Sequence, residues 1–485
     1  MQVFPGNGPG ASFAVGAGPR KSVAHQPGEP MLGRLAIVAA IATQPLLVAA
    51  QVPAASDSAI RDIVQNRVQT RRAVGLVVAT LDHGQSRIYT AGTSGAAGVP
   101  LDGNTVFEIG SITKVFTASL LADMVARGEV QLEDPIAKYL PKSVQVPTRN
   151  GRQITLVDLA TQTSGLPRLP SNLNPRDQTN PYADYSVEQL YSFLSGYQLT
   201  RDIGSQYEYS NLGVGLLGHV LALRAGKSYE DLLTERILRP LGMNDTRITL
   251  TPAMKSRLAP GHSVTGTIVP NWDLPTLAGA GALRSTANDL LKFLAANMDS
   301  TSKPLGRVLA ATHVPRRDVT AGQMRIGLNW HILIATGQPI VWHNGGTGGY
   351  RTFIGFDEAN KRAAVVLSNQ NVSADDIGFH LIDARAPLTP APKVRTEIAL
   401  DSTLLQAYVG VYDLSPAFAI TITREGASLF AQATGQPKIQ LFAESPTAFF
   451  LKEVDAQITF DKDASGKVTR LVLHQGGADV PGVKR

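Results

Sequence analysis

The pattern of apolar and polar positions predicts helices and strands that alternate unevenly along the chain. Residues 58–72 have helical spacing, and residues 73–79 and 86–90 read as two strands joined around Asp82-His83-Gly84. A first long helix is predicted over 112–127, with its apolar residues mostly on one side. A pair of strands therefore precedes the first long helix.

The middle of the chain is predicted to be mainly helical, and strands return after it. The predicted helices cover residues 155–161, 186–195, 211–225, 229–238 and 286–297. The later strands cover 341–342, 351–356 and 363–368, and a further helix lies near 374–384. This order predicts an α+β domain over 57–385, in which an antiparallel sheet built from both ends is flanked by helices and carries a helical insert.

A Pro-rich segment separates this domain from a tail of different character. Residues 386–394 are predicted to be a linker, and residues 395–485 a small antiparallel β-domain, either a barrel or a sandwich. Its predicted strands cover 418–423, 428–433, 439–442, 448–451, 456–460 and 468–474. We expect the aromatic residues Phe449, Phe450 and Phe460 to form its core rather than a ligand site.

The first fifty residues have the features of a secretion signal. Met31 to Arg34 lead into an almost uncharged run, 35–50, which ends in small residues before Gln51. Residues 31–50 are therefore predicted to be a signal peptide of a secreted or periplasmic bacterial protein; an uncleaved anchor is the alternative. Residues 1–30, rich in Gly and Pro, are expected to be disordered or to precede the true start at Met31.

Composition excludes several classes of function. The 485 residues include 45 basic and 39 acidic side chains, a net charge of +6. A net charge this small does not indicate a nucleic-acid-binding protein. There is no cysteine, which excludes disulfides, thiolate nucleophiles and cysteine-based metal sites. No stable membrane span is expected once the signal is cleaved.

Ser111 and Lys114 are the first candidates for chemistry. Their three-residue spacing at the start of a helix places the amine within reach of the hydroxyl. A desolvated lysine has a lowered pKa and can take the serine proton, while the helix N-terminus stabilises a developing oxyanion. The alternative is a capping serine beside a solvated lysine.

Two further motifs follow along the chain. Tyr209-Ser-Asn211 stands at the entrance to another predicted helix, where the phenol would relay protons and the amide would orient a carbonyl. His343-Asn344-Gly345-Gly346 follows the strand predicted at 341–342, and the Gly346 N–H would complete an oxyanion hole with that of Ser111. Taken singly, the first could be a turn tyrosine with an Asn cap, and the second a Gly-rich hairpin with an exposed His.

In this order, Ser-x-x-Lys, Tyr-x-Asn and His-x-Gly resemble the motifs of the penicillin-recognising serine hydrolases. That group includes class C β-lactamases, D-Ala-D-Ala carboxypeptidase-like proteins and family VIII carboxylesterases. The resemblance covers about residues 57–385 and implies a β-lactamase/transpeptidase-like domain. It extends through FEIGSITKVF (107–116), LEDP (132–135), KYLP (138–141), LATQTSGLP (159–167), PLGMNDT (240–246) and AGALRSTANDL (280–290). The tail, with YVGVY at 408–412, resembles a β-domain often fused to such hydrolases.

The resemblance implies an acyl-enzyme mechanism. Ser111 would attack the carbonyl, Lys114 and Tyr209 would handle the proton, and Asn211 would position the acyl group. The N–H groups of Ser111 and Gly346 would hold the oxyanion, and water would release the acid. The resemblance implies neither a metal nor an organic cofactor, and its substrates are small esters, β-lactams or D-peptides.

One departure from the family pattern shifts the expected substrate. Class C β-lactamases carry Lys-Thr-Gly where this chain has His343-Asn344-Gly345. A permanent cation is thereby replaced by a group whose unperturbed pKa is about 6.5. We therefore expect a secreted hydrolase of short carboxylic esters and also of β-lactam amides. The alternative is a dedicated β-lactamase, or a D-amino-acid peptidase or penicillin-binding protein with slow deacylation.

Other classes of protein fit the sequence less well. Thr113 occupies the second glycine position of a Gly-x-Ser-x-Gly elbow, no His-Glu-x-x-His is present, and the glycines of 345–349 lack the ending of a P-loop. A non-catalytic surface protein, which binds a partner through its β-domain, is the remaining hypothesis, and the presence of all three motifs argues against it.

Overall fold

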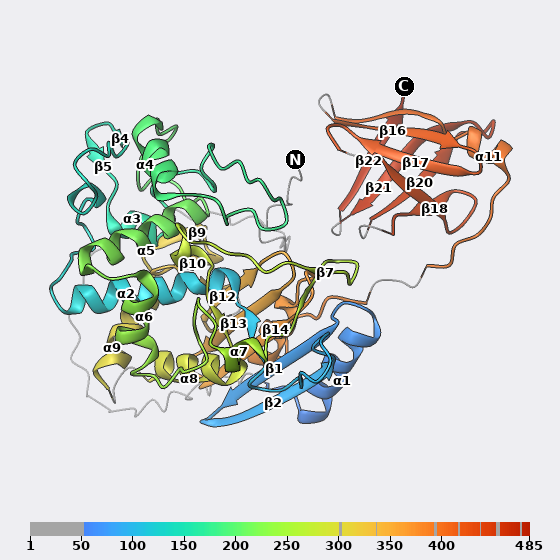
Figure 1. The fold of residues 1–485 in the computed structure, drawn as a ribbon. Coiled ribbons are helices and arrows are strands. Elements are labelled where there is room, and N and C mark those ends of the chain that lie inside the picture. The colour runs from blue at the N-terminus through green and yellow to red at the C-terminus, as the bar shows by residue number, and fades with distance from the viewer. Residues whose placement is uncertain are drawn as a thin grey trace, which may run out of the picture. The chain divides into compact units, whose positions relative to one another are not determined.

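A computed structural model describes residues 53–299, 303–335, 337–391, 395–415, 418–436, 438–452, 456–475 and 478–485. The predicted leader (31–50) and the stretch before it (1–30) lie outside the described residues. Figure 1 shows a region in which helices surround a sheet, and a separate region made of strands. Each region has its own hydrophobic core.

An eight-stranded antiparallel sheet forms the centre of the first region. Its strand order is β2-β1-β14-β13-β12-β11-β10-β9. The strands are β1 (Gly75–Asp82), β2 (Gln85–Gly92), β9 (Arg317–Thr320), β10 (Met324–Ile326), β11 (His331–Leu333), β12 (Ile340–Gly346), β13 (Arg351–Asp357) and β14 (Arg362–Ser368). Leu76 pairs with Ser368, so both ends of the domain contribute to one sheet, as the sequence predicts.

The predicted turn between the first two strands is a two-residue hairpin. His83 and Gly84 both have positive φ, 49° and 84°, which is the backbone conformation of a type I′ turn. Each of the two turn positions requires a residue that tolerates the left-handed region. Glycine adopts this conformation without steric cost, which explains its presence at position 84.

Helices cover both faces of the sheet. On one face lie α1 (Asp57–Gln69) and α10 (Asp375–Ile382), packed on a small apolar cluster. The larger core on the other face includes residues of the helical insert. The helices that contribute to this core are α2 (Thr113–Ala126), α3 (Leu156–Ala160), α4 (Val187–Gly196), α5 (Asn211–Ala225), α6 (Tyr229–Leu233), α8 (Ala287–Met298) and α9 (Pro304–Ala310). The short helix α7 (Pro252–Lys255) contributes no residue to it.

The helix that follows Ser111 differs from its prediction. Its apolar residues were expected on one side, but every residue from Thr113 to Met124 is buried. A helix that is buried all round belongs to the centre of a domain rather than to its surface. The predicted division into an apolar and a polar side is wrong, because small and polar residues such as Thr117 and Ser119 also pack in the interior.

Short elements complete this region. The 3-10 helices are η1 (Gly110–Ile112), η2 (Ile136–Lys138), η4 (Ala278–Ala280) and η5 (Ala311–His313), and a π-helical turn, η3 (Thr234–Leu238), continues α6. The two-stranded sheets pair β3 (Phe107–Glu108) with β8 (Arg284–Ser285), β4 (Thr148–Arg149) with β5 (Arg152–Gln153), and β6 (Gly261–His262) with β7 (Ile268–Val269).

The second region is a closed barrel, one of the two predicted forms. Tyr412 on the first strand pairs with Lys484 on the last, so neither strand leaves an open edge there. The elements are α11 (Ser402–Gln406), β15 (Gly410–Ser415), β16 (Phe418–Glu425), β17 (Ser428–Ala433), β18 (Ile439–Ala443), β19 (Ala448–Phe450), β20 (Ala456–Lys462), β21 (Val468–Gln475) and β22 (Ala478–Lys484). Phe449 and Phe460 belong to the barrel core, as expected, whereas Phe450 is buried outside that core against Phe442, because neighbouring residues of a strand face opposite sides.

Candidate active site

Ser111 lies in η1, where the chain leaves β3 and enters α2. The Thr113 hydroxyl donates to the Gly110 carbonyl (2.7 Å) and accepts from the Leu283 N–H (3.1 Å). The Thr352 hydroxyl donates to the Ile109 carbonyl (3.0 Å). These bonds join the turn that carries Ser111 to the central sheet, so its position does not depend on α2 alone.

Lys114 is fully buried and its ammonium group contacts three acceptors. Nζ lies 3.1 Å from Ser111 Oγ, 2.8 Å from Asn211 Oδ1 and 2.7 Å from the Ala280 carbonyl oxygen. The predicted contact between the lysine and the serine is therefore present. The structure does not match the alternative of a solvated lysine.

The surroundings of Lys114 favour its neutral form. Burial lowers the pKa of Lys114 well below its ordinary value, and the nearby charge of Arg168 lowers it further. A neutral amine has two N–H groups, enough for Asn211 Oδ1 and the Ala280 carbonyl, and its lone pair is then available to the Ser111 hydroxyl 3.1 Å away. The arrangement can therefore remove a proton from Ser111.

Tyr209 lies on the other side of the amine. Lys114 Nζ is 4.8 Å from the centre of the Tyr209 ring, and Arg168 Cζ is 5.3 Å from it. Burial raises the pKa of Tyr209, and a hydrogen bond with the Ser111 hydroxyl and the charge of Arg168 offset part of that rise. The phenol therefore keeps its proton near neutral pH, which suits a relay better than a standing base.

Asn211 is the first residue of α5, and its side chain is held on both sides. Its Oδ1 accepts from Lys114 and its Nδ2 donates to the Tyr182 hydroxyl (3.1 Å). Ser210 caps the helix, since its Oγ accepts from the Gly213 N–H (2.8 Å). Asn211 is thus placed at the site by a capped helix N-terminus, but it is not itself the cap.

Glycines allow η1 to approach β12 closely. Gly110 has φ of 50°, and a Cβ built there would lie 2.7 Å from the Gly346 nitrogen. A Cβ on Gly345 would lie 2.0 Å from the Ile109 carbonyl oxygen. Neither position has room for a side chain. The packing brings the backbone of Gly346 beside the turn that carries Ser111, as a shared oxyanion hole requires.

His343 is not placed as the sequence suggested. The strand predicted at 341–342 continues to Gly346 as β12, and the His343 side chain is fully buried. The alternative of a hairpin with an exposed His is therefore wrong. Alternation along the longer strand turns His343 inward, beside His331, with ring centres 5.2 Å apart.

The buried imidazole of His343 is held in its neutral form. Burial lowers the pKa of His343 well below its ordinary value, and the charges of His331 and Lys114 add to this effect. Its Nδ1 donates to the Asn344 carbonyl (2.6 Å), and its Nε2 is buried without a partner among the described residues. His343 therefore supplies no cation near neutral pH.

Asn344 points away from the serine, toward α10. Its Nδ2 donates to Asp375 Oδ2 (2.6 Å), and burial raises the pKa of Asp375 to about 6, although the hydrogen bond from Asn344 and the charge of Arg351 oppose that rise. Asn344 and Gly345 were both predicted to bind substrate. The structure places Asn344 against a carboxylate and Gly345 against the Ile109 carbonyl, and their contact with substrate stays a prediction.

Several residues of the site were missed by the sequence analysis. They are Arg168, Tyr182, Trp272, Ala280 and Arg351. Tyr182 and Trp272 pack against each other with ring centres 5.6 Å apart, from loops far apart in the sequence. Ala280 acts through its carbonyl, which no side-chain motif reveals. Two of these positions adjoin a sequence signal, because Arg168 directly follows the quoted LATQTSGLP segment and Ala280 begins the quoted AGALRSTANDL segment.

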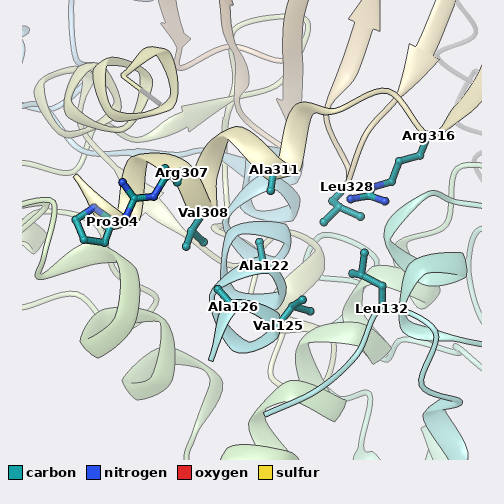
Figure 2. Close-up of a pocket in the computed structure, with 10 residues that line it drawn as sticks. All are labelled: Ala122, Val125, Ala126, Leu132, Pro304, Arg307, Val308, Ala311, Arg316 and Leu328. Carbon is teal, nitrogen blue, oxygen red and sulfur yellow. The ribbon is translucent and has the colours of Figure 1, made fainter. Parts of the chain in front are cut away.

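A separate cavity, away from Ser111, lies along the second half of α2. It has a volume of about 380 Å³ and is lined mainly by apolar residues of α2 and α9 (Figure 2). Ala122, the nearest lining residue of α2 to Ser111 in sequence, is about 16 Å further along a helix at 1.5 Å per residue. None of the predicted site residues lines this cavity.

The described residues offer neither a metal-binding cluster nor a membrane-spanning helix. Among the described residues, no group of three or more His, Asp or Glu side chains could hold a metal ion. Within the same part of the chain, no helix has both the length and the apolar character needed to cross a bilayer.

The fold and the Ser-x-x-Lys helix entrance define the class of serine β-lactamases and D-Ala carboxypeptidases. The sequence model of the Beta-lactamase family matches residues 60–385, more than half of the chain, so the chain belongs to that family. This confirms the resemblance. Residues 394–481 match a second model, described as a domain of unknown function (DUF3471).

Individual relatives agree with this assignment. The chain is 32% identical to the D-alanyl-D-alanine-carboxypeptidase/endopeptidase AmpH of Escherichia coli, over 62% of this chain and 82% of that protein. It is 26% identical to penicillin-binding protein 4* of Bacillus subtilis, over 79% and 89%. A crystal structure of a β-lactamase/D-alanine carboxypeptidase from Yersinia pestis, complexed with citrate, matches with 25% identity and a TM-score of 0.57, over 67% and 95%.

Proposed function

We propose that this protein is a serine hydrolase that works through an acyl-enzyme on Ser111. The observation that carries the proposal is the buried Lys114 amine, 3.1 Å from the Ser111 hydroxyl and surrounded so as to favour its neutral form. An amine in this state activates a serine that water alone would leave unreactive. Membership of the Beta-lactamase family supports the hydrolase class.

In the proposed acylation step, Lys114 takes the proton of Ser111 as Oγ attacks the substrate carbonyl. The N–H groups of Ser111 and Gly346 receive the oxyanion, and Asn211 orients the acyl group. Tyr209 donates its own proton to the leaving group and is reprotonated by Lys114, because its raised pKa keeps the phenol protonated until the leaving group needs the proton. Water then attacks the ester carbonyl of the acyl-enzyme, its proton passes by way of Lys114 to Ser111 Oγ, and the acid is released.

The proposed substrates are short carboxylic esters, with β-lactam amides as additional substrates. The neutral His343 supports this choice, because a strand that lacks the lysine of Lys-Thr-Gly presents no ammonium to a substrate carboxylate. The predicted signal over 31–50 supports a location in the periplasm or outside the cell. The predicted barrel domain would be a fused accessory domain of the enzyme.

A second candidate is a D-alanyl peptidase or penicillin-binding protein that deacylates slowly. The relatives favour it, because AmpH is named as a D-alanyl-D-alanine carboxypeptidase/endopeptidase and another match is named as a penicillin-binding protein. The two candidates share acylation of Ser111 and differ in substrate and in the rate of deacylation.

Steady-state kinetics on two substrates test the proposal. Protein from Gln51 onward would be assayed with p-nitrophenyl butyrate and with a chromogenic cephalosporin, and Ser111→Ala would serve as the control. We expect ester turnover to exceed cephalosporin turnover and both to vanish in the variant. Faster cephalosporin turnover, or stable acylation without turnover, would favour the second candidate; activity that survives Ser111→Ala would overturn the mechanism.

A further inference from the structure

The separate cavity beside α2 has an apolar base and a charged rim. Ala122 and Leu328 are buried at its base, whereas Arg307 and Ala311 are exposed where it opens to solvent. Figure 2 shows the side chains of α2 on one side of the cavity and those of α9 and η5 on the other. Its volume of about 380 Å³ lies within the range of about 300–1,000 Å³ that is typical of small-molecule sites. The space between the two helices therefore suits a narrow apolar chain.

Two arginines that line this cavity have no acidic partner. Arg307 is exposed on α9, and Arg316 is half-buried in the segment after η5. Among the described residues, neither guanidinium forms an ion pair, and Arg316 Nε is shielded from solvent without a hydrogen-bond partner. A shielded N–H of a charged group that is left unpaired costs free energy, which a bound anion would recover. Arg316 therefore gains more than the exposed Arg307 from an anionic ligand.

The charges around Arg316 leave this end of the cavity electropositive. Burial lowers the pKa of Arg316, the charge of Glu133 opposes that fall, and the charge of Arg317 adds to it. Glu133 is exposed and forms no ion pair with Arg316 in the part of the chain that the structure describes. The Arg316 N–H donates to the Ile326 carbonyl (2.8 Å), which fixes the backbone to β10. A negative charge next to the Arg316 side chain would thus be stabilised.

We infer that this cavity is a binding site for a free fatty carboxylate of medium chain length. The aliphatic chain lies between α2 and α9, and the carboxylate accepts hydrogen bonds from Arg316. A planar guanidinium matches a carboxylate with two parallel N–H donors, which makes arginine well suited to this task. The inference goes beyond the proposed hydrolysis at Ser111, because none of the residues placed in that site lines the cavity.

Calorimetric titration of the full-length protein with decanoate, below its micelle concentration, tests the inference. Decanol and decyltrimethylammonium serve as the neutral and cationic ligands with the same chain. We expect decanoate to bind at least about tenfold more tightly than decanol, as for the gain of one charged hydrogen bond, and the cation to bind more weakly than either. Octanoate in place of decanoate should weaken binding about fourfold for each methylene removed, because the chain is buried.

Three variants locate the ligand within the molecule. Arg316→Gln should weaken decanoate binding about 10- to 100-fold and decanol binding less than about twofold, since only the contact with the charged group is lost. Val308→Phe adds a ring to the wall of the cavity and should weaken the binding of both ligands. Arg317→Gln is the matched control, because it removes the same charge from a neighbouring exposed residue that does not line the cavity. It should change either affinity less than about twofold, since an exposed charge is screened by solvent.

Three results would overturn the inference. The first is that the wild-type protein does not bind decanoate. The second is equal affinity for decanoate and decanol, which would mean that the cavity accepts apolar groups without recognising a carboxylate. The third is decanoate binding that survives both Arg316→Gln and Val308→Phe, which would place the ligand elsewhere in the molecule. Failure of the proposed function would be seen separately, because decanoate binding in the cavity does not require Ser111 and should be unchanged in Ser111→Ala.

Discussion

The hydrolase domain and the barrel bury different kinds of side chain. Among the described residues, the fully buried polar and charged side chains, tyrosines aside, all lie between Arg67 and Asp383, and none lies in the barrel. The barrel core is aliphatic and aromatic, and its two fully buried tyrosines donate to backbone carbonyls. The barrel therefore buries side chains that favour stability, whereas the hydrolase domain also buries groups that oppose it.

This difference shows where the molecule accepts a loss of stability for the sake of chemistry. Lys114 and His343 have pKa values that burial lowers, and Asp375 has one that burial raises, so each would ionise more readily in water. Perturbed groups of this kind cluster at functional sites. The comparison can be tested by two kinds of substitution. One replaces a buried ionisable side chain of the hydrolase domain, and the other removes a packed side chain from the barrel core.

Lys114→Met should have the largest effect on activity and should not lower stability. The variant keeps the length of the side chain but removes the amine, so we expect kcat/KM to fall about 10²- to 10⁴-fold, the usual contribution of a general base. Thermal unfolding should occur at an equal or higher temperature, because a desolvated amine is replaced by an apolar group. A marked loss of stability would contradict the idea that Lys114 is kept for chemistry alone.

Phe460→Ala should show the opposite pattern. The ring is buried in the barrel core against Tyr408 and Phe449, so its removal should destabilise the barrel by about 3–5 kcal/mol. The activity of the folded protein at Ser111 should not change. Denaturant unfolding would measure the stability, and the ester assay would measure the activity. Phe442→Ala is the control, because Phe442 is half-buried and its removal should destabilise the barrel less.

Asp375→Asn should change how stability depends on pH. The rise of the Asp375 pKa from its ordinary 3.8 to about 6 means that the folded state binds a proton more tightly than the unfolded state. Ionised Asp375 therefore destabilises the folded state. This loss of stability is absent below about pH 4, grows between about pH 4 and 6, and is complete above about pH 6. At about 1.4 kcal/mol per pKa unit it amounts to at most about 3 kcal/mol.

The measurement is denaturant unfolding of wild type and Asp375→Asn at a series of pH values. The free energy of unfolding of the variant should rise relative to that of wild type as the pH rises from about 4 to 6. Asparagine has no proton to lose, and its side-chain oxygen still accepts the hydrogen bond from Asn344. Parallel curves for the two proteins would contradict the raised pKa.

His343→Lys should have the smallest effect of the four. A lysine at this place on β12 should raise the ratio of kcat/KM for a carboxylate-bearing β-lactam over that for a neutral ester by about tenfold, the value of one charged hydrogen bond. The proximity of His331 and Lys114 limits the gain, since a second amine would be desolvated beside them. If the ratio of the two kcat/KM values does not change in folded protein, the residue at position 343 does not determine the preference for a carboxylate.

Local signals were sufficient for most of the predicted elements. The helix over 211–225 was predicted with the bounds it has, because Ser210 caps its start and Gly226, with φ of 63°, ends it. Strands β9, β10 and β11 were missed, since three or four residues are too few for alternation to be visible. In the barrel, β15 was not predicted, and β22 contains Pro481 and Gly482, residues that favour loops, so only pairing with β15 and β21 identifies it as a strand.

The sequence by itself determined the α+β class, the β-domain and the spacing of Ser111 and Lys114, because these depend on neighbours along the chain. Tertiary structure alone decided that Lys114 is desolvated, that His343 is turned inward and neutral, and that Arg351 lies against the Gly346 peptide. The physical reason is that burial and the distances between charges depend on segments far apart in sequence, whereas caps, turns and helical spacing depend on segments close together.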